Sequence, residues 1–112
     1  LIVQDTSTLE CSSYNLTVNG TTTLGASGGN VGTLSKNNAT GGLLFNGSLF
    51  LDNNSGVTNG INFTGNPNVE FRGGITSFYT VAAINSGTGT WSFTTNNQNV
   101  VISNPKTFNC IK

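Results

Sequence analysis

Residues 43–51 read LLFNGSLFL, two apolar runs joined by Asn46-Gly47 and Ser48. Asn-Gly between apolar runs is typical of a two-residue type I′ hairpin turn, because both turn residues need a positive φ. Pairing across that turn gives two apolar faces, with Leu43, Phe45 and Phe50 on one and Leu44, Leu49 and Leu51 on the other. We therefore expect this hairpin to lie in a core or to line the acceptor groove of a subunit interface.

Two further Asn-Gly pairs, Asn19-Gly20 and Asn59-Gly60, also stand between β-type runs and predict further hairpins. Additional strands are expected at residues 69–72, 75–84, 90–95 and 100–103. Apolar residues do not recur at a helical spacing, so little or no helix is expected. The sequence predicts an all-β fold, a small antiparallel β-sandwich or jelly roll of about eight or nine short strands.

Two of the expected strands alternate between apolar and polar residues, which is typical of strands with one exposed face. In residues 69–72, Glu70 and Arg72 share one face and are expected to form an ion pair. In residues 90–95, Trp91 and Phe93 share the apolar face.

Charged residues make up 7% of the chain, and the formal net charge is zero. The four cations, Lys36, Arg72, Lys106 and Lys112, are too scattered to bind nucleic acid or an anionic membrane surface. No apolar run is long enough to insert into a membrane. A surface with so little charge favours self-assembly or a coat of glycans, and both alternatives place the protein outside the cell, on a cell surface or on a virion.

The two cysteines, Cys11 and Cys110, lie near opposite ends of the chain and are expected to form a disulfide. Two buried free thiols and an intermolecular pairing remain open as alternatives. Residues 1–10 precede Cys11 and are expected to form an extended arm, while residues 11–112 form a single β domain.

The arm places Leu1, Val3 and Leu9 on one face at a period of two, so it is a candidate donor strand for the sheet edge of another copy. The alternative is a strand that pairs within its own domain.

Catalytic groups are scarce in this sequence. It contains no histidine, and its acidic residues, Asp5, Glu10, Asp52 and Glu70, are scattered. Residues 52–56 resemble half of a calcium loop without the closing acidic residue, and residues 28–32 are rich in glycine but lack the lysine of a phosphate loop. We expect no enzymatic activity, no metal and no cofactor.

Six N-x-S/T sequons are candidate N-glycosylation sites, although the asparagine, serine and threonine content accounts for most of them by chance. Asn38 and Asn53 are the best candidates, and the others are Asn15, Asn62, Asn46 and Asn19. The threonine clusters lack the regular ladder of an ice-binding face. Three aromatic residues, Trp91, Tyr79 and Tyr14, leave a small carbohydrate-binding domain as one alternative function.

An extended arm, cysteines near the two ends, low charge and Asn/Thr/Gly-rich turns together resemble the subunits of extracellular filaments, such as archaeal threads, bundling pili and fibres built by donor-strand exchange. That resemblance implies a structural subunit whose partners are copies of itself. The stretch Leu16–Leu24 (LTVNGTTTL) also resembles viral fibre shafts and heads. This second resemblance implies a trimeric attachment domain whose loops, such as residues 25–32 and 85–89, bind a host-surface or glycan receptor.

Overall fold

The computed structural model describes residues 1–4, 6–25, 32–51, 59–77, 83–95 and 100–102, and within these ranges it contains strands and no helix. The strands are β1 (Ile2–Val3), β2 (Ser7–Glu10), β3 (Leu16–Val18), β4 (Thr22–Leu24), β5 (Gly32–Ser35), β6 (Leu43–Phe45), β7 (Leu49–Leu51), β8 (Asn59–Asn62), β9 (Val69–Phe71), β10 (Ile75–Ser77), β11 (Ala83–Asn85), β12 (Trp91–Phe93) and β13 (Val100–Ile102). The prediction of an all-β fold is confirmed.

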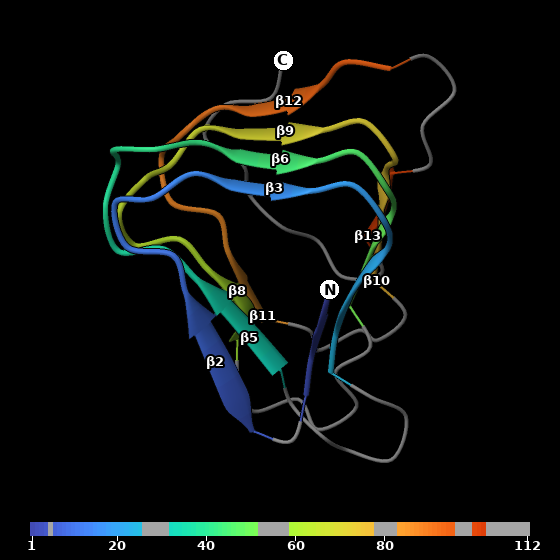
Figure 1. Cartoon of the computed structure of the whole chain (residues 1–112), viewed down its shortest axis with the longest axis horizontal. Coiled ribbons are helices and arrows are strands. Elements are labelled where there is room, and N and C mark those ends of the chain that lie inside the picture. The colour runs from blue at the N-terminus through green and yellow to red at the C-terminus, as the bar shows by residue number, and fades with distance from the viewer. Residues whose placement is uncertain (5, 26–31, 52–58, 78–82, 96–99, 103–112) are drawn as a thin grey trace.

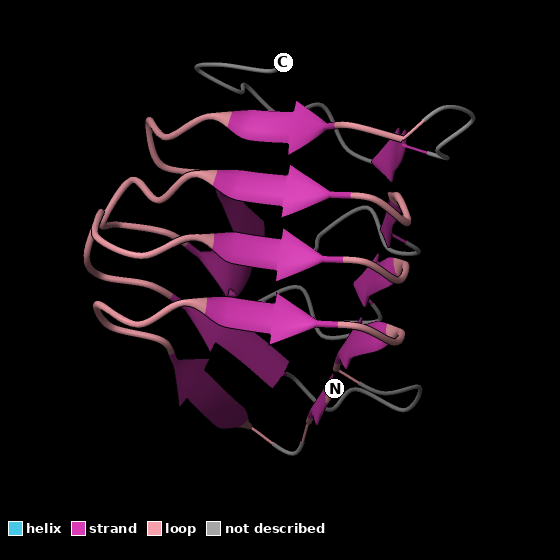
Figure 2. Ribbon diagram, turned by 45° about the horizontal axis from the view of Figure 1, so that its top comes forward, coloured by secondary structure: helices cyan, strands magenta, loops and turns pink. Residues whose placement is uncertain are grey.

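The strands form three sheets in the orders β1-β4-β7-β10-β13, β11-β8-β5-β2 and β12-β9-β6-β3, which we call sheets A, B and C. Every strand pair among the described residues is parallel. The chain visits the three sheets in turn and returns to each one a coil later, so the molecule is a parallel β-helix (Figures 1 and 2). The predicted antiparallel sandwich or jelly roll is therefore wrong.

The coils repeat at about the same length. In sheet A, Thr22 pairs with Leu49 and Leu49 pairs with Ile75, which are spacings of 27 and 26 residues. In sheet C, Leu16, Leu43 and Val69 are partners at the same two spacings. Each coil therefore places equivalent residues directly above those of the coil before it.

The predicted hairpins at the Asn-Gly pairs are also wrong, because these pairs turn a corner between two sheets instead of reversing the chain. Asn46-Gly47 joins β6 of sheet C to β7 of sheet A, and Asn19-Gly20 likewise joins β3 to β4. Asn59-Gly60 lies within β8.

The corner also changes which side chains of residues 43–51 share a face. The first and third residues of both strands are buried inside the helix, and they are Leu43, Phe45, Leu49 and Leu51. Leu44 and Phe50 point outward and are half-buried. The predicted faces mixed these groups, because a hairpin would keep both strands in one sheet.

Glycines stack at the corner between sheets C and A, where successive coils come closest. A Cβ atom added to Gly47 would lie 2.5 Å from the carbonyl carbon and oxygen of Gly20, and one added to Gly73 would lie 2.3 Å from the carbonyl carbon of Gly47. A Cβ atom added to Gly20 would meet nothing within 4 Å among the described residues, because Gly20 belongs to the first coil. The stack therefore requires glycine in every coil that has another one beneath it.

The residues before these glycines form a hydrogen-bonded ladder. Nδ2 of Asn46 donates to Oδ1 of Asn19 at 2.8 Å, and Nη1 of Arg72 donates to Oδ1 of Asn46 at 3.3 Å. The Asn-Gly pairs thus stabilise contacts between coils, and this role needs residues that are one coil apart.

Aromatic rings fill the interior beneath sheet C. The Phe71 ring stacks on Phe45 and Phe93, with centroids 5.5 and 5.1 Å away, and is tilted against Trp91 at 5.1 Å. Trp91 is fully buried. The apolar face predicted for Trp91 and Phe93 is confirmed, since both side chains belong to or pack against the core.

A buried lysine holds the loop between sheets B and C. The Nζ atom of Lys36 donates to the carbonyl oxygens of Ser12 and Tyr14, the latter at 3.1 Å. The Glu10 carboxylate accepts the backbone N–H groups of Ser12 and Asn37 at 2.8 and 3.2 Å. A hydrogen bond from Ser35 is the largest cause that lowers the pKa of the Glu10 carboxyl.

Residues 1–10 pair with later strands of the same chain. In β1, Ile2 and Val3 pair with Thr23 and Leu24, and β2 pairs with β5. Val3 is buried in the core, and Leu9 is partly buried against it. Leu1–Leu9, the candidate donor strand, is thus part of the first coil.

Cys11 is buried, and burial raises the pKa of its thiol. Among the described residues Cys11 is free and no disulfide is present. Cys110 lies outside those residues, so its pairing with Cys11 stays a prediction.

Candidate functional site

Two surfaces of the β-helix have features suited to binding, and the first is its open end. Strands β1, β2 and β3 are each the edge strand of a sheet, and together they make the first coil. This coil lies at one end of the stack, with one side covered by the second coil (Figure 2). We call its other side the open edge.

Inward-facing side chains of the first coil are more exposed than those above them. Leu9, Leu16 and Val18 are half-buried, whereas their partners in the second coil, Leu34, Leu43 and Phe45, are buried. Ile2 is 68% exposed. A hollow of about 350 Å³ opens here, lined by Leu1, Ile2, Val3, Gln4, Ser7, Thr8 and Leu9. The open edge therefore presents apolar surface.

Backbone groups on the open edge are also available for pairing. Successive residues of a strand direct their N–H and C=O groups to alternate sides. The carbonyls of Leu1 and Val3 accept N–H groups from β4 and the residue after it, and the Cys11 N–H donates to Ser35. The backbone groups of Ile2 and Thr8, which lie between or at odd spacing from these residues, are therefore directed away from the second coil.

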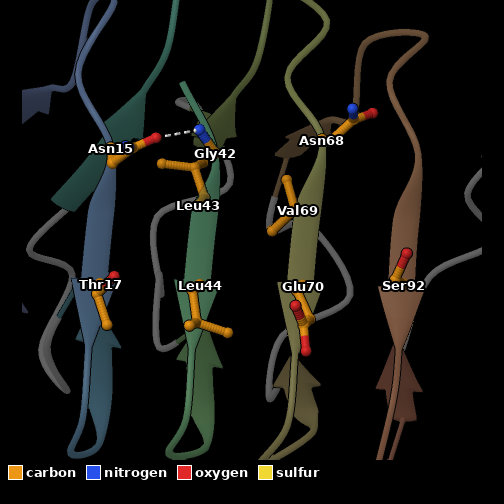
Figure 3. Close-up of a pocket in the computed structure, with 9 residues that line it drawn as sticks. All are labelled: Asn15, Thr17, Gly42, Leu43, Leu44, Asn68, Val69, Glu70 and Ser92. Carbon is orange, nitrogen blue, oxygen red and sulfur yellow. Dashed lines mark hydrogen bonds between the residues drawn. The ribbon is translucent and has the colours of Figure 1, made fainter. Parts of the chain in front are cut away.

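The second surface is a shallow groove across the outer face of sheet C, which we call the sheet C groove (Figure 3). It has a volume of about 350 Å³. One row of side chains comes from the middle of the four strands, and its members are Thr17, Leu44, Glu70 and Ser92. A second row, directly before the strands, contains Asn15, Gly42 and Asn68.

Gly42 creates the deepest part of the second row, because it places no side chain between two asparagines. A Cβ atom added to Gly42 would meet nothing within 4 Å of the described residues, and its φ lies outside the left-handed region. A larger residue could therefore occupy the groove without strain.

The two asparagines have fixed orientations. Oδ1 of Asn15 accepts the Gly42 N–H at 2.7 Å, and Oδ1 of Asn68 accepts the Thr90 N–H at 3.1 Å. Since the amide oxygens are engaged, the NH₂ groups remain as donors, and neither has a protein partner in the part of the chain that the structure describes.

Glu70 contributes a negative charge to the groove. Its Oε1 atom accepts from Nε of Arg72 at 2.7 Å and from Oγ1 of Thr94 at 2.8 Å, which confirms the predicted ion pair. The hydrogen bond from Arg72 is the main cause that lowers the pKa of the Glu70 carboxyl. The group is thus ionised at neutral pH, and Oε2 remains an acceptor.

The candidate glycosylation sites fall into two groups. Asn15, Asn19 and Asn38 are exposed, whereas Asn46 and Asn62 are half-buried. The half-buried pair belongs to ladders between coils, since Oδ1 of Asn62 accepts from Nδ2 of Asn85 at 3.0 Å. Asn53 lies outside the described residues. Glycosylation stays a prediction at all six positions.

The aromatic residues proposed for sugar stacking are not grouped at either surface. Trp91 is fully buried, and Tyr14 is 76% exposed. Tyr79, residues 26–31 and the half calcium loop at 52–56 lie outside the described part of the chain.

Sequence reasoning identified Glu70 and Arg72 but missed the sheet C groove. Asn15, Gly42 and Asn68 are 27 and 26 residues apart, and only the register of the coils places them in one row. An internal repeat at that spacing was the available signal.

Within the described ranges, no three histidine, cysteine or acidic side chains are grouped to hold a metal ion. A search of the same ranges for a helix long and apolar enough to cross a membrane finds none. No protein-family model, curated protein or solved structure matches this chain.

Proposed function

We propose that this chain is a non-enzymatic extracellular structural module whose copies assemble into a filament by strand pairing at the open edge. The observation that carries the proposal is that all three sheets end together in the first coil, with half-buried apolar side chains and unpaired backbone groups. An exposed strand edge is a template for pairing with another chain.

The occupant of the open edge is a second copy of this chain. Every inner coil of the β-helix already rests on a coil of the same kind, at the same register and with stacked apolar side chains. A coil from another copy that docked on the first coil would cover Leu9, Leu16 and Val18 as Leu34, Leu43 and Phe45 are covered within the chain. Head-to-tail stacking of this kind does not close, so it produces a filament.

The low charge of the chain supports the same proposal. With a net charge of zero, long-range repulsion between copies is weak. The edge strands also lack the devices that usually prevent strand pairing, since β1, β2 and β3 contain no lysine and no proline.

An attachment domain built from three parallel copies is a second candidate, and the outer face of sheet A favours it. Its outward row carries no charge and consists of Ile2, Thr23, Phe50, Thr76 and Val101. Ile2 and Val101 are 68% and 46% exposed. Uncharged apolar rows of this kind mark protein interfaces, and here they favour lateral packing of β-helices side by side.

The test is negative-stain microscopy with light scattering on the full chain and on an Ile2→Lys/Thr8→Pro variant. Lysine and proline block an edge strand, and the Thr8 N–H is not needed within the chain. Filaments from the original chain and monomers from the variant are expected, while Thr8→Val, which keeps the N–H, should still form filaments. Monomers from the original chain at all concentrations would refute the proposal.

A Phe50→Glu variant separates the two candidates. It places a charge on the outer face of sheet A and leaves the open edge unchanged. If filaments persist, end-to-end stacking is supported, whereas a trimer that Phe50→Glu dissociates into monomers supports the attachment domain.

A further inference from the structure

We propose that the sheet C groove binds a neutral oligosaccharide. The groove is distinct from the open edge, and the inference does not depend on assembly. It rests on the shape of the groove, on the orientation of its polar groups and on its charge.

The shape fits a small part of a linear ligand. A volume of about 350 Å³ is near the lower end of the range for ligand sites, and the groove runs across several strands of sheet C. Gly42 lets the floor come close to the backbone between Asn15 and Asn68. A ligand lying there would cross the coils, parallel to the axis of the β-helix.

The polar groups are held in place before any ligand binds. The amides of Asn15 and Asn68 are anchored through their oxygens, so their NH₂ groups are oriented donors. Glu70 offers Oε2 as an acceptor, because Oε1 is held by Arg72 and Thr94. Groups fixed in this way lose little conformational entropy on binding.

The arrangement of these groups suits a sugar. Equivalent residues on neighbouring coils are about 4.8 Å apart, so donors and acceptors repeat along the groove. Two hydroxyl groups, on Thr17 and Ser92, stand at its two sides, and Leu44 supplies an apolar contact between them. Sugars present hydroxyl groups at their edges and C–H groups on their faces, and both find partners here.

The charge of the groove selects a neutral ligand. Glu70 would repel a carboxylate or sulfate, and Arg72, the nearest cation, is engaged with Glu70 and Asn46. No aromatic ring lines the groove. We therefore expect weak binding, with Kd on the order of millimolar for a short oligosaccharide.

The test uses the full chain and a panel of neutral tetrasaccharides from glucan, mannan, xylan and galactan, with tetragalacturonate as the acidic comparison. Binding is followed by NMR, where the side-chain NH₂ signals of Asn15 and Asn68 report on the groove directly. Saturable shifts of both signals with at least one neutral sugar are expected, and tetragalacturonate should bind at least tenfold more weakly.

Two glycine variants provide a matched pair. Gly42→Gln fills the groove and should weaken binding at least tenfold, while Gly20→Gln adds the same side chain at an open position away from the groove and should leave binding unchanged. Because Gly20 lies on the open edge, Gly20→Gln should impair filament formation, and Gly42→Gln should not. The two proposals can therefore fail separately.

Three results would overturn the inference: no panel member shifts the two amide signals, Gly42→Gln binds as well as the original chain, or the acidic sugar binds best. The shift measurement needs no variant, so it remains decisive even if Gly42→Gln does not fold.

Discussion

Replacing Gly47 by alanine tests the glycine stack between sheets C and A. The new Cβ atom would lie 2.5 Å from the carbonyl carbon and oxygen of Gly20 and 2.9 Å from the Thr21 nitrogen. Carbon atoms in contact are normally about 3.5–4.0 Å apart, so the backbone of one coil must move. Gly20→Ala is the control, because its methyl group would meet no described atom within 4 Å.

The expected difference between the two variants follows from strain and from unfolded-state entropy. Overpacking of this kind costs about 1–3 kcal/mol. Removing a glycine restricts the unfolded chain and stabilises the protein by about 0.4–1 kcal/mol. Gly47→Ala should thus lower the free energy of unfolding by ~1–2 kcal/mol, and Gly20→Ala should leave it unchanged or raise it slightly. A difference of ~2 kcal/mol corresponds to roughly 8 °C in Tm for a chain of this size.

Urea unfolding followed by Trp91 fluorescence measures both variants at concentrations where the chain is monomeric. The fully buried Trp91 becomes exposed on unfolding and reports the transition. Equal free energies of unfolding for Gly47→Ala and Gly20→Ala would refute the close approach of the coils at this corner.

Three further predictions concern other contacts. Phe71→Ala removes the ring that contacts Phe45, Phe93 and Trp91 and should lower the free energy of unfolding by about 3–5 kcal/mol in urea titrations, with Phe71→Leu losing less. Lys36→Met leaves the Ser12 and Tyr14 carbonyls without their ammonium donor, so a loss of about 2–3 kcal/mol is expected in thermal unfolding, and no loss would contradict the role of Lys36. The lowered pKa of Glu10 means that its stabilising effect is complete above the unfolded pKa and disappears as pH falls through the folded pKa. Stability measured between pH 6 and 2 should therefore fall more steeply in the original chain than in Glu10→Gln, and parallel curves would show that Glu10 contributes nothing.

The β-class could be predicted from the sequence because short apolar bursts and polar turns are properties of local segments. The direction of each turn could not, since Asn-Gly fits both a hairpin and a corner between stacked coils. Comparison of distant segments would have helped, because residues 16–20, 43–47 and 69–73 share an apolar-x-apolar-polar-Gly pattern at spacings of 27 and 26 residues. Arginine replaces asparagine in the third segment and the next spacing differs, which obscures the repeat.

The site shows the same division between local and distant information. The Glu70–Arg72 ion pair was predictable, because both residues belong to one strand and strand alternation places them together. The row of Asn15, Gly42 and Asn68 depends on the register of three coils. Its members have no common local motif, so the groove becomes visible only after the coils are stacked.

Stacked coils also determine how the molecule would respond to mechanical force. The hydrogen bonds of the three sheets run along the stacking axis, so tension on the first coil along this axis would separate one coil before the next is loaded. Each released coil of about 26 residues would add roughly 90 Å of extended chain. A fibre of such units would lengthen in regular steps under load, and refolding of a coil on its neighbour would restore the original length.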